Sequence, residues 1–233
     1  MKRRGVHELI KRGLSFIQLR VKAGPLKGTK MIATTGSHFI AGDYELEKTA
    51  CIAEAATEGM TIVDVGAHVG YFTMIMSKKV GPNGAIHSFE PRDLNRNFLK
   101  RHIRSNGISN VTVYSQCVGD QYGKVMFEER TGTGTGHISS EGNVEVDMVT
   151  LDGMVAEGKI PVPDMLKIDV EGAEILVLNG ARETISSRKP KMVLAVHSDE
   201  LERQCREILE PLGYAFTDLG QEKGDKEFLV QCA

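Results

Sequence analysis

Between residue 60 and the C-terminus, short apolar runs alternate with segments whose apolar residues recur every three or four positions. The first run, TIVDVGA at 61–67, predicts a buried strand, and YFTMIMSKKV at 71–80 predicts a helix. AIHSFEP at 85–91 predicts the next strand, and DLNRNFLKRHIRSNG at 93–107 predicts a helix that its glycine ends. Strands that alternate with helices of this length favour a parallel sheet with helices on both faces.

The alternation changes after VTVYSQCVGD at 111–120, which predicts a third strand. Where a third helix would follow, the chain gives GKVMFEER at 123–130 and NVEVDMVTLD at 143–152, joined by the loop TGTGTGHISSEG. We expect an extra β-hairpin in place of one helix. The loop glycines do not have the spacing of a phosphate-binding turn, so 131–142 is expected to be a flexible hairpin loop or a substrate lid.

The pattern of strand and helix then resumes to the end of the chain. We expect strands at 164–170, 190–197, 215–220 and 226–233, and helices at 173–189 and 202–214. With the three earlier strands, these elements form a mostly parallel seven-stranded sheet. The predicted fold class is therefore α/β, and ligands in such sheets bind beyond the carboxyl ends of the strands.

The first 30 residues are strongly basic, with nine Lys or Arg residues against the single acid Glu8. One apolar stripe runs through them at spacings of four, three and four: Ile10, Leu14, Ile17 and Val21. This pattern predicts a basic amphipathic helix, which GPLKG at 24–28 would end. It would cover the core or a homodimer partner, or would attract phosphates, nucleic acid or anionic lipid. We divide the chain into this extension, 1–40, and a main domain, 41–233.

Composition is that of a globular protein rather than a disordered one. The 233 residues are 41% hydrophobic and 26% charged, with a formal net charge of −2, so a nucleic-acid partner is disfavoured. The four cysteines lie far apart with no CxxC pair, which favours a reducing cytoplasm. No stretch approaches the roughly 20 apolar residues that cross a bilayer, and charges interrupt any signal-peptide core at the N-terminus.

A glycine turn follows the first predicted strand. Its pattern is D-x-G-x-x-x-G, with Asp64, Gly66 and Gly70, and His68 stands where a dinucleotide-binding turn needs its second glycine. Such a turn lets a nucleoside approach the backbone but offers little to a pyrophosphate. Glu90, at the end of the second strand, can accept hydrogen bonds from both hydroxyls of a ribose. The turn therefore indicates a nucleoside ligand without a pyrophosphate.

Six segments together carry a family resemblance: DVGAHVGYF, SFEP, VTVYSQCVGD, VEVDMVTLD, LKIDVEGAE and PKMVLAVH. In this order and spacing, from about residue 41 to the C-terminus, the chain resembles the FkbM family of class I S-adenosylmethionine-dependent methyltransferases. The resemblance implies a Rossmann-like fold, S-adenosyl-L-methionine as cofactor and S-adenosyl-L-homocysteine as product. The chain departs from the family at His68, usually Asn, and at Ala195, usually an acid.

The resemblance and the residue chemistry together assign cofactor contacts. Asp64 is expected to hold the methionyl ammonium, directly or through water, and Glu90 the ribose. Asp120 resembles the acid that accepts the adenine amino group, although its VGDQYG setting also suits a turn. The full predicted set is Asp64, Gly66, Ala67, His68, Gly70, Tyr71, Phe72, Glu90, Pro91, Cys117, Val118, Asp120 and Asp169.

Three residues are candidates for the chemistry. Asp169, at the end of the fourth strand, is expected near the methyl group, where it would orient the acceptor; Glu171 would do likewise or cap the following helix. His197, at the end of the fifth strand, would be a general base with a near-neutral pKa or a structural histidine. The three also have metal-ligand chemistry, but HSDE lacks the Asp-Asn pair of catechol-type methyltransferases, so no metal is expected.

The acceptor class follows partly from what is missing. The chain has no N/D-P-P-Y stretch after the fourth strand and no Pro-Cys pair, the signatures of enzymes that methylate nucleic-acid bases. We expect O-methylation of a hydroxyl on a small metabolite, sugar or natural product. The alternatives are methylation of RNA or another macromolecule, and a cofactor-binding module without catalysis.

Overall fold

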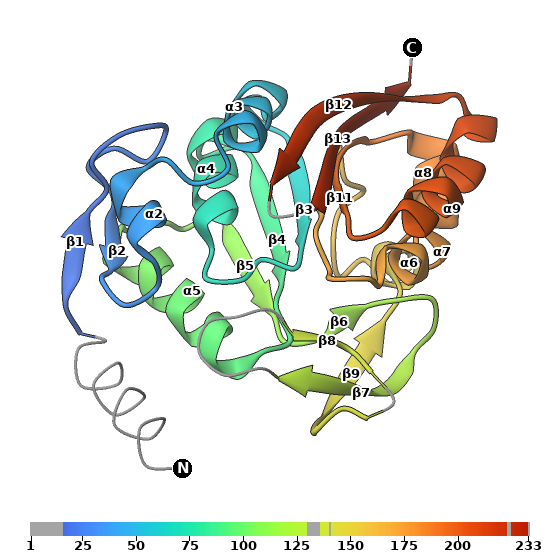
Figure 1. Cartoon of the computed structure of the whole chain (residues 1–233), viewed down its shortest axis with the longest axis horizontal. Coiled ribbons are helices and arrows are strands. Elements are labelled where there is room, and N and C mark those ends of the chain that lie inside the picture. The colour runs from blue at the N-terminus through green and yellow to red at the C-terminus, as the bar shows by residue number, and fades with distance from the viewer. Residues whose placement is uncertain (1–15, 130–135, 140, 223–224, 233) are drawn as a thin grey trace.

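A seven-stranded sheet forms the centre of the protein (Figure 1). The computed structural model describes residues 16–129, 136–139, 141–222 and 225–232. The strand order is β12-β13-β11-β10-β3-β4-β5. In that order, the strands span Tyr214–Glu222, Asp225–Cys232, Lys191–Val196, Met165–Ile168, Thr61–Val65, Ala85–Phe89 and Val111–Tyr114.

Strand direction confirms the predicted mostly parallel sheet. β11, β10, β3, β4 and β5 are parallel, and β13 lies antiparallel between β11 and β12. The parallel strands are nearly continuous apolar runs because helices cover both of their faces. This is the arrangement that the family resemblance implies, and it brings the ends of β3, β4 and β10 to one edge.

Helices form a layer on each face of the sheet (Figure 1). Alternate residues of β3 face opposite layers: Ile62 packs with the helices on one face, and Val63 with those on the other. The first layer holds α3 (Leu46–Ala55), α4 (Tyr71–Val80) and α5 (Asp93–Ser105), and the second holds α6 (Leu151–Ala156), α7 (Glu174–Asn179), α8 (Arg182–Arg188) and α9 (Asp199–Leu209). α4 occupies the predicted residues, and α5 begins at the predicted Asp93.

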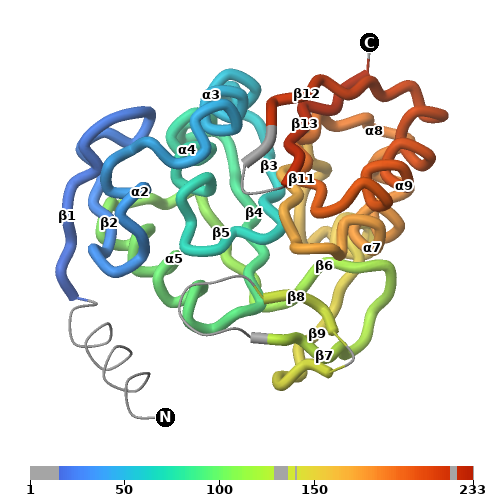
Figure 2. The backbone as a smooth tube through the Cα atoms, viewed as in Figure 1, coloured from blue at the N-terminus to red at the C-terminus, as the bar shows by residue number. Residues whose placement is uncertain are grey.

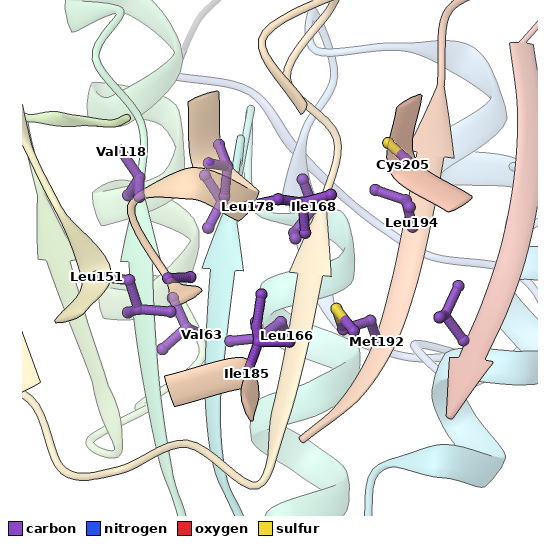
Figure 3. Close-up of a cluster of buried hydrophobic side chains, with 14 of the residues drawn as sticks. Val63, Val118, Leu151, Leu166, Ile168, Leu178, Ile185, Met192, Leu194 and Cys205 are labelled. Carbon is purple, nitrogen blue, oxygen red and sulfur yellow. The ribbon is translucent and has the colours of Figure 1, made fainter. Parts of the chain in front are cut away.

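The core of the second layer explains why β10 and β11 are so apolar. Leu166 and Ile168 of β10 and Leu194 of β11 are fully or almost fully buried against Leu178 and Ile185 of the helices (Figure 3). Burying one such side chain contributes roughly 1.5–3 kcal/mol. Packing in this core therefore fixes the positions of the carboxyl ends of β10 and β11, and so places the residues that follow these strands.

The predicted hairpin is part of a separate four-stranded sheet, ordered β6-β9-β7-β8. β7 (Gly123–Glu129) and β9 (Val144–Val149) pair antiparallel as expected, and β8 (Gly136–Ile138) adds to β7. The predicted strand at 111–120 is split, because β5 ends at Tyr114 while β6 (Cys117–Val118) pairs with β9 instead. Cys117, Phe127, Val146 and Met148 form the small core of this second sheet.

Two other expectations need correction. The single helix predicted at 173–189 is broken into α7 and α8 at Gly180, where an added Cβ would lie 1.8 Å from the carbonyl oxygen of Gly119. The N-terminal helix was predicted to reach Val21, but β1 (Gln18–Arg20) is a strand paired with β2 (Lys30–Ile32). The backbone hydrogen bonds of this hairpin replace those of a helix. The earlier part of that prediction, and the proposed dimer contact, concern residues 1–15, outside the described part.

The N-terminal segment lies along the first helical layer. Figure 2 shows β1, β2 and α2 (Ser37–Ala41) beside α5, before the chain enters α3. β2 contacts α5, and α3 contacts both α4 and β11. This path carries residues 35–48 to the edge of the sheet where β3 and β10 end. Within the described residues, none of the helices has the length and apolarity that a bilayer crossing requires.

Candidate active site

A cavity of about 370 Å³ lies at the carboxyl ends of β3, β4 and β10. Three parts of the chain line it: the strand ends, the N-terminal segment and the second sheet. The strand ends, with the turns and first helical residues that follow them, contribute Val65, Gly66, Ala67, His68, Tyr71, Phe72, Phe89, Glu90, Pro91, Asn95, Lys167, Asp169, Val170, Glu171 and Ala173. The N-terminal segment contributes Thr35, Gly36, His38, Phe39 and Tyr44, and the second sheet contributes Cys117, Val118, Phe127, Gly136 and Ile138.

The glycine turn after β3 forms the floor of the cavity. Gly66 has φ +80°, and a Cβ there would lie 1.8 Å from the backbone oxygen of Asp169, so only glycine fits. The amides of Gly66 and Ala67 both donate to the Phe89 carbonyl at 3.0 Å. His68 also has a left-handed φ, 52°, a conformation that Asn, the usual family residue, adopts readily. Gly70, also predicted as a cofactor residue, is the N-cap of α4 and does not line the cavity, and its Cβ position faces Leu99.

Glu90 lies at the end of β4, where it was predicted, and only 5% of it is exposed. Its two carboxylate oxygens accept hydrogen bonds from the amides of His68 at 2.7 Å and Arg92 at 2.9 Å. Burial raises its pKa to about 7, although these hydrogen bonds and the charge of Lys167 oppose the rise. The structure thus joins Glu90 directly to the glycine turn. A carboxylate held in this way keeps lone pairs for ribose hydroxyls.

The second sheet supplies an apolar wall beside Glu90. Cys117 and Val118 are buried there, and Phe127 extends the wall. Asn95 of α5 also lines the cavity, and its buried Oδ1 has no hydrogen-bond partner in the described part of the chain. An unsatisfied buried acceptor of this kind is consistent with a ligand donor. Asp120 is exposed and is not among the residues that line the cavity, so the structure does not bring it to the position of its predicted adenine contact.

Asp64 lies beneath the floor, with no exposed surface. Its carboxylate accepts a hydrogen bond from Thr73 Oγ1 at 2.5 Å and lies 3.3 Å from Lys167 Nζ. Lys167 in turn donates to the Gly66 carbonyl at 2.7 Å. The structure therefore does not bring Asp64 to the cavity, where it was predicted to meet an ammonium group. Its contacts support the turn from below.

Asp169 lines the cavity and is held by two buried lysines. Lys48 Nζ donates to its Oδ2 at 2.8 Å, and Lys167 Nζ lies 3.7 Å from the same oxygen. Burial favours the neutral acid, but the two ammonium groups outweigh it and hold the pKa of Asp169 well below its usual range. Asp169 is therefore an ionised hydrogen-bond acceptor and a very weak base.

His197 lies behind Asp169 and Glu171 rather than on the cavity wall. Its Nδ1 is 2.7 Å from the fully buried carboxylate of Glu174, and its Nε2 lies within 3.9 Å of carboxylate oxygens of Asp169, Glu171 and Asp225. Burial alone would lower its pKa, but the carboxylates of Glu174, Asp169 and Glu171 raise it to about 9. The expected near-neutral pKa is thus wrong, because the fold brings the buried carboxylate of Glu174 within hydrogen-bond distance of the ring.

Glu171 lines the cavity and is the third candidate. It has φ +55°, an uncommon conformation for a residue with a side chain. It does not cap a helix: α7 begins at Glu174, whose own carboxylate accepts the Gly172 amide. Burial raises the pKa of Glu171, partly offset by His197, whose Nε2 lies 3.7 Å away. No described residue donates a hydrogen bond to Glu171, so its carboxylate remains free to accept one from a ligand.

The three candidates also satisfy the spacing of a metal site. Asp169, Glu171 and His197 each offer a ligand atom within 4.8 Å of the other two. With a pKa of about 9, however, the imidazole of His197 carries a proton at neutral pH that a cation would have to displace. The sequence-based expectation of no metal remains a prediction.

Several residues of the site had not been predicted. Lys48 binds Asp169 from outside the recognised motifs, Glu227 accepts a second hydrogen bond from Lys48, and Lys167 supports the glycine turn. Lys167 had a signal in the sequence, since it is the one charged residue in the buried run MLKI. Glu227 had none, but it pairs across the sheet with Ala195, where the family usually has an acid. The neighbouring strand therefore brings a carboxylate to the position where Ala195 lacks one.

Comparison with known proteins agrees with this geometry. The family model of the methyltransferase FkbM domain matches residues 64–223. Hexuronic acid methyltransferase AglP of Haloferax volcanii is 25% identical over 183 residues, which cover 77% of this chain and 73% of AglP. Methyltransferase 1 of Beauveria bassiana is 26% identical over 143 residues, covering 51% of this chain and 57% of that protein.

Solved structures share the fold. A methyltransferase FkbM from Methylobacillus flagellatus superposes with a TM-score of 0.55 at 20% identity, covering 84% of this chain and 55% of that one. Aeropyrum pernix fibrillarin, solved with natively bound S-adenosyl-L-methionine, gives 0.51 at 16% identity, covering 78% and 73%. The family match spans most of the chain and coincides with the strands and turns that build the cavity. The chain therefore belongs to the FkbM family of methyltransferases.

Proposed function

We propose that the protein transfers a methyl group from S-adenosylmethionine to a hydroxyl group of a small metabolite, sugar or natural product. The observation that carries this proposal is the cavity itself. One end joins the glycine turn to Glu90 and the apolar wall of Cys117 and Val118, and the other end presents the carboxylate of Glu171. A nucleoside fits the first end, and an acceptor fits the second.

The chain's own residues divide the work of binding. Glu90 and the backbone of Gly66 would hold the ribose and the methionyl chain, and Cys117 and Val118 would pack against the adenine. Bound there, S-adenosylmethionine supplies a methyl group that its sulfonium already activates. The protein must then orient the acceptor, exclude water and accept one proton.

Glu171 is the best base among the three candidates. Asp169 is too weak a base because two lysines hold it ionised, and His197 is already protonated below about pH 9. Glu171 has a raised pKa and a carboxylate without a hydrogen-bond donor in the described structure. In this proposal it accepts the acceptor's hydroxyl proton, while Asp169 remains an ionised acceptor of hydrogen bonds.

The charge of this end also favours a hydroxyl over a carboxylate as methyl acceptor. Asp169 and Glu171 both face the cavity, and a negatively charged acceptor would meet like charges in a partly buried site. The relative AglP is named for a hexuronic acid, a sugar that carries both hydroxyl and carboxyl groups. A sugar hydroxyl is therefore the first acceptor class to test.

The proposal is tested in two steps. In a thermal-shift assay, S-adenosylmethionine and S-adenosylhomocysteine should raise the melting temperature, and NAD, NADP and FAD should not. Turnover with labelled S-adenosylmethionine against matched libraries of sugars, phenols and carboxylic acids should then give methyl ethers. Stabilisation by a dinucleotide alone would refute the cofactor assignment. Methyl esters as the sole products would refute the hydroxyl assignment, and binding without turnover would support a cofactor-binding module.

A further inference from the structure

Lys48 contacts Asp169, which lines the cavity, from outside the part of the chain that the family model matches. It lies on α3, before residue 64, and only 2% of it is exposed. Glu227, one of its partners, lies on β13, after residue 223. α3 packs against β11 and β12, so the fold brings these two flanking segments together at the end of β10.

The ammonium group of Lys48 donates hydrogen bonds to two carboxylates and forms an ion pair with a third. Nζ lies 2.8 Å from Asp169 Oδ2, 2.8 Å from Glu227 Oε1 and 3.1 Å from Glu45 Oε2. A buried lysine without partners would lose its proton, but here the acids outweigh burial and the pKa of Lys48 is well above its usual value. The group is therefore a fixed cation with little freedom to turn.

This arrangement decides which oxygen of Asp169 is available. Oδ2 is occupied by Lys48, with Lys167 at 3.7 Å, whereas Oδ1 has, among the described residues, a single neighbouring cation, His197 Nε2 at 3.8 Å. The backbone of Asp169 also packs on Gly66 of the turn. A carboxylate with one oxygen tied and the other open presents a defined acceptor to the cavity.

We propose that Lys48 is a positioning residue, which orients the Asp169 carboxylate toward the cationic part of S-adenosylmethionine. This inference rests on the proposed function, because it takes S-adenosylmethionine as the ligand of the cavity. Glu227 holds Lys48 in place, so the Lys48–Glu227 pair acts through Asp169 and does not touch the ligand. The N-terminal segment and the last strand thereby complete the site.

A double-mutant cycle on ligand affinity tests the inference. At about pH 8.5, above the pKa of Glu227, which burial raises to about 7, Lys48→Met with Glu227→Gln removes one positive and one negative charge, so the net charge of the site is unchanged. We expect this pair, and Asp169→Asn alone, each to weaken S-adenosylmethionine binding by about five- to tenfold in calorimetry. In the Asp169→Asn background the pair of substitutions should change affinity by less than about twofold, because the carboxylate that Lys48 orients is absent.

Controls separate positioning from a loss of structure. Lys124→Met with Glu145→Gln removes an exposed ion pair of the second sheet in the same charge-neutral way and should leave affinity unchanged. Lys48→Arg, which keeps the charge, should restore part of the affinity. If the Met variant does not fold, Lys48→Gln with Glu227→Gln enters the same cycle, since glutamine retains a hydrogen-bond donor.

The outcomes are distinct. The inference would be overturned if the Lys48→Met/Glu227→Gln pair weakened binding equally in the wild-type and Asp169→Asn backgrounds, or if it did not weaken binding at all. Either result would leave the proposed function intact. No effect of Asp169→Asn would overturn the inference as well. Failure of the wild-type protein to bind S-adenosylmethionine would instead refute the proposed function on which the inference rests.

Discussion

The carboxylate of Glu174 lies 2.7 Å from Nδ1 of His197, and it is fully buried at the start of α7. This contact fixes the imidazole ring and turns Nε2 toward Asp169, Glu171 and Asp225. Since all four neighbours are acids, the protonated form of His197 is strongly favoured in the folded protein. The histidine is thus a fixed positive charge behind the carboxylates that line the cavity.

His197 should therefore make stability depend on pH. An unfolded histidine titrates near pH 6.5, and in the fold its pKa is raised to about 9. The folded state holds the proton more tightly, so this stabilisation is complete below about pH 6.5. It declines as pH rises and is lost above about pH 9. Urea denaturation of wild type and His197→Gln across this range should show a difference that shrinks with pH. A constant difference would contradict the assignment.

Glu171 should govern the pH dependence of turnover. Glu171→Gln is expected to lower turnover by roughly 10²–10⁴ and to leave S-adenosylmethionine affinity within about twofold, because the residue acts on the acceptor. The wild-type rate should rise with pH through a pKa above the ordinary value near 4.5, and the variant should lose this limb. Initial rates on an acceptor from the sugar library provide the measurement.

His197→Gln is the comparison for that experiment. It should retain the low-pH limb, because the proton passes to Glu171 and not to the imidazole. If this variant loses the limb and Glu171→Gln keeps it, the base role returns to His197, despite its raised pKa.

Glu90 should link cofactor binding to proton release. Ribose hydroxyls donate to the ionised carboxylate, so binding favours the charged form of a group whose pKa burial raises to about 7. S-adenosylmethionine affinity should thus fall as pH drops below about 7, with net proton release on binding. Calorimetry in buffers of different ionisation enthalpy measures this release.

Two variants of Glu90 complete the test. Glu90→Gln should show no such release, and Glu90→Ala should bind at least about tenfold more weakly, because charge-assisted hydrogen bonds contribute roughly 1.5–3 kcal/mol each. If a folded Glu90→Ala protein bound S-adenosylmethionine with wild-type affinity, Glu90 would not be a cofactor-binding residue.

Replacing Gly66 by any residue with a side chain should disrupt the turn, whereas the nearby Gly172 should accept alanine. Both Gly66 and Gly172 have a positive φ, but a Cβ at Gly172 has open space and one at Gly66 meets the Asp169 backbone at 1.8 Å. Gly172→Ala is expected to cost about 1–2 kcal/mol, the usual penalty for the left-handed conformation. Gly66→Ala should cost more and should abolish S-adenosylmethionine binding. Chemical denaturation and thermal shift of the two variants provide the check, and equal costs would show that the turn can move.

Much of the fold was predictable because its signals are local. Short apolar runs located β3 and β4, and the period of 3.6 residues located α4 and α5, since each of these elements buries one run or stripe of its own residues. The glycine turn and Glu90 were predictable for the same reason, as they follow strand ends directly. The expectation was wrong where contacts between distant residues matter. Gly119 packs against Gly180, where the predicted helix is broken, and β6 pairs with β9 and does not continue β5.

The site was only partly predictable. Asp169, Glu171 and His197 were located by sequence, but Lys48 lies 121 positions from Asp169, and Lys48 and Glu227 lie 179 positions apart. The charge states of the candidates depend on these neighbours, because a pKa reflects burial and the nearest charges, whatever their place in the chain. The sequence by itself thus determined the sheet, the turn and the chemical types of the site residues. Only the tertiary structure decided which carboxylate is held ionised, which histidine is protonated and which acid is free to accept a proton.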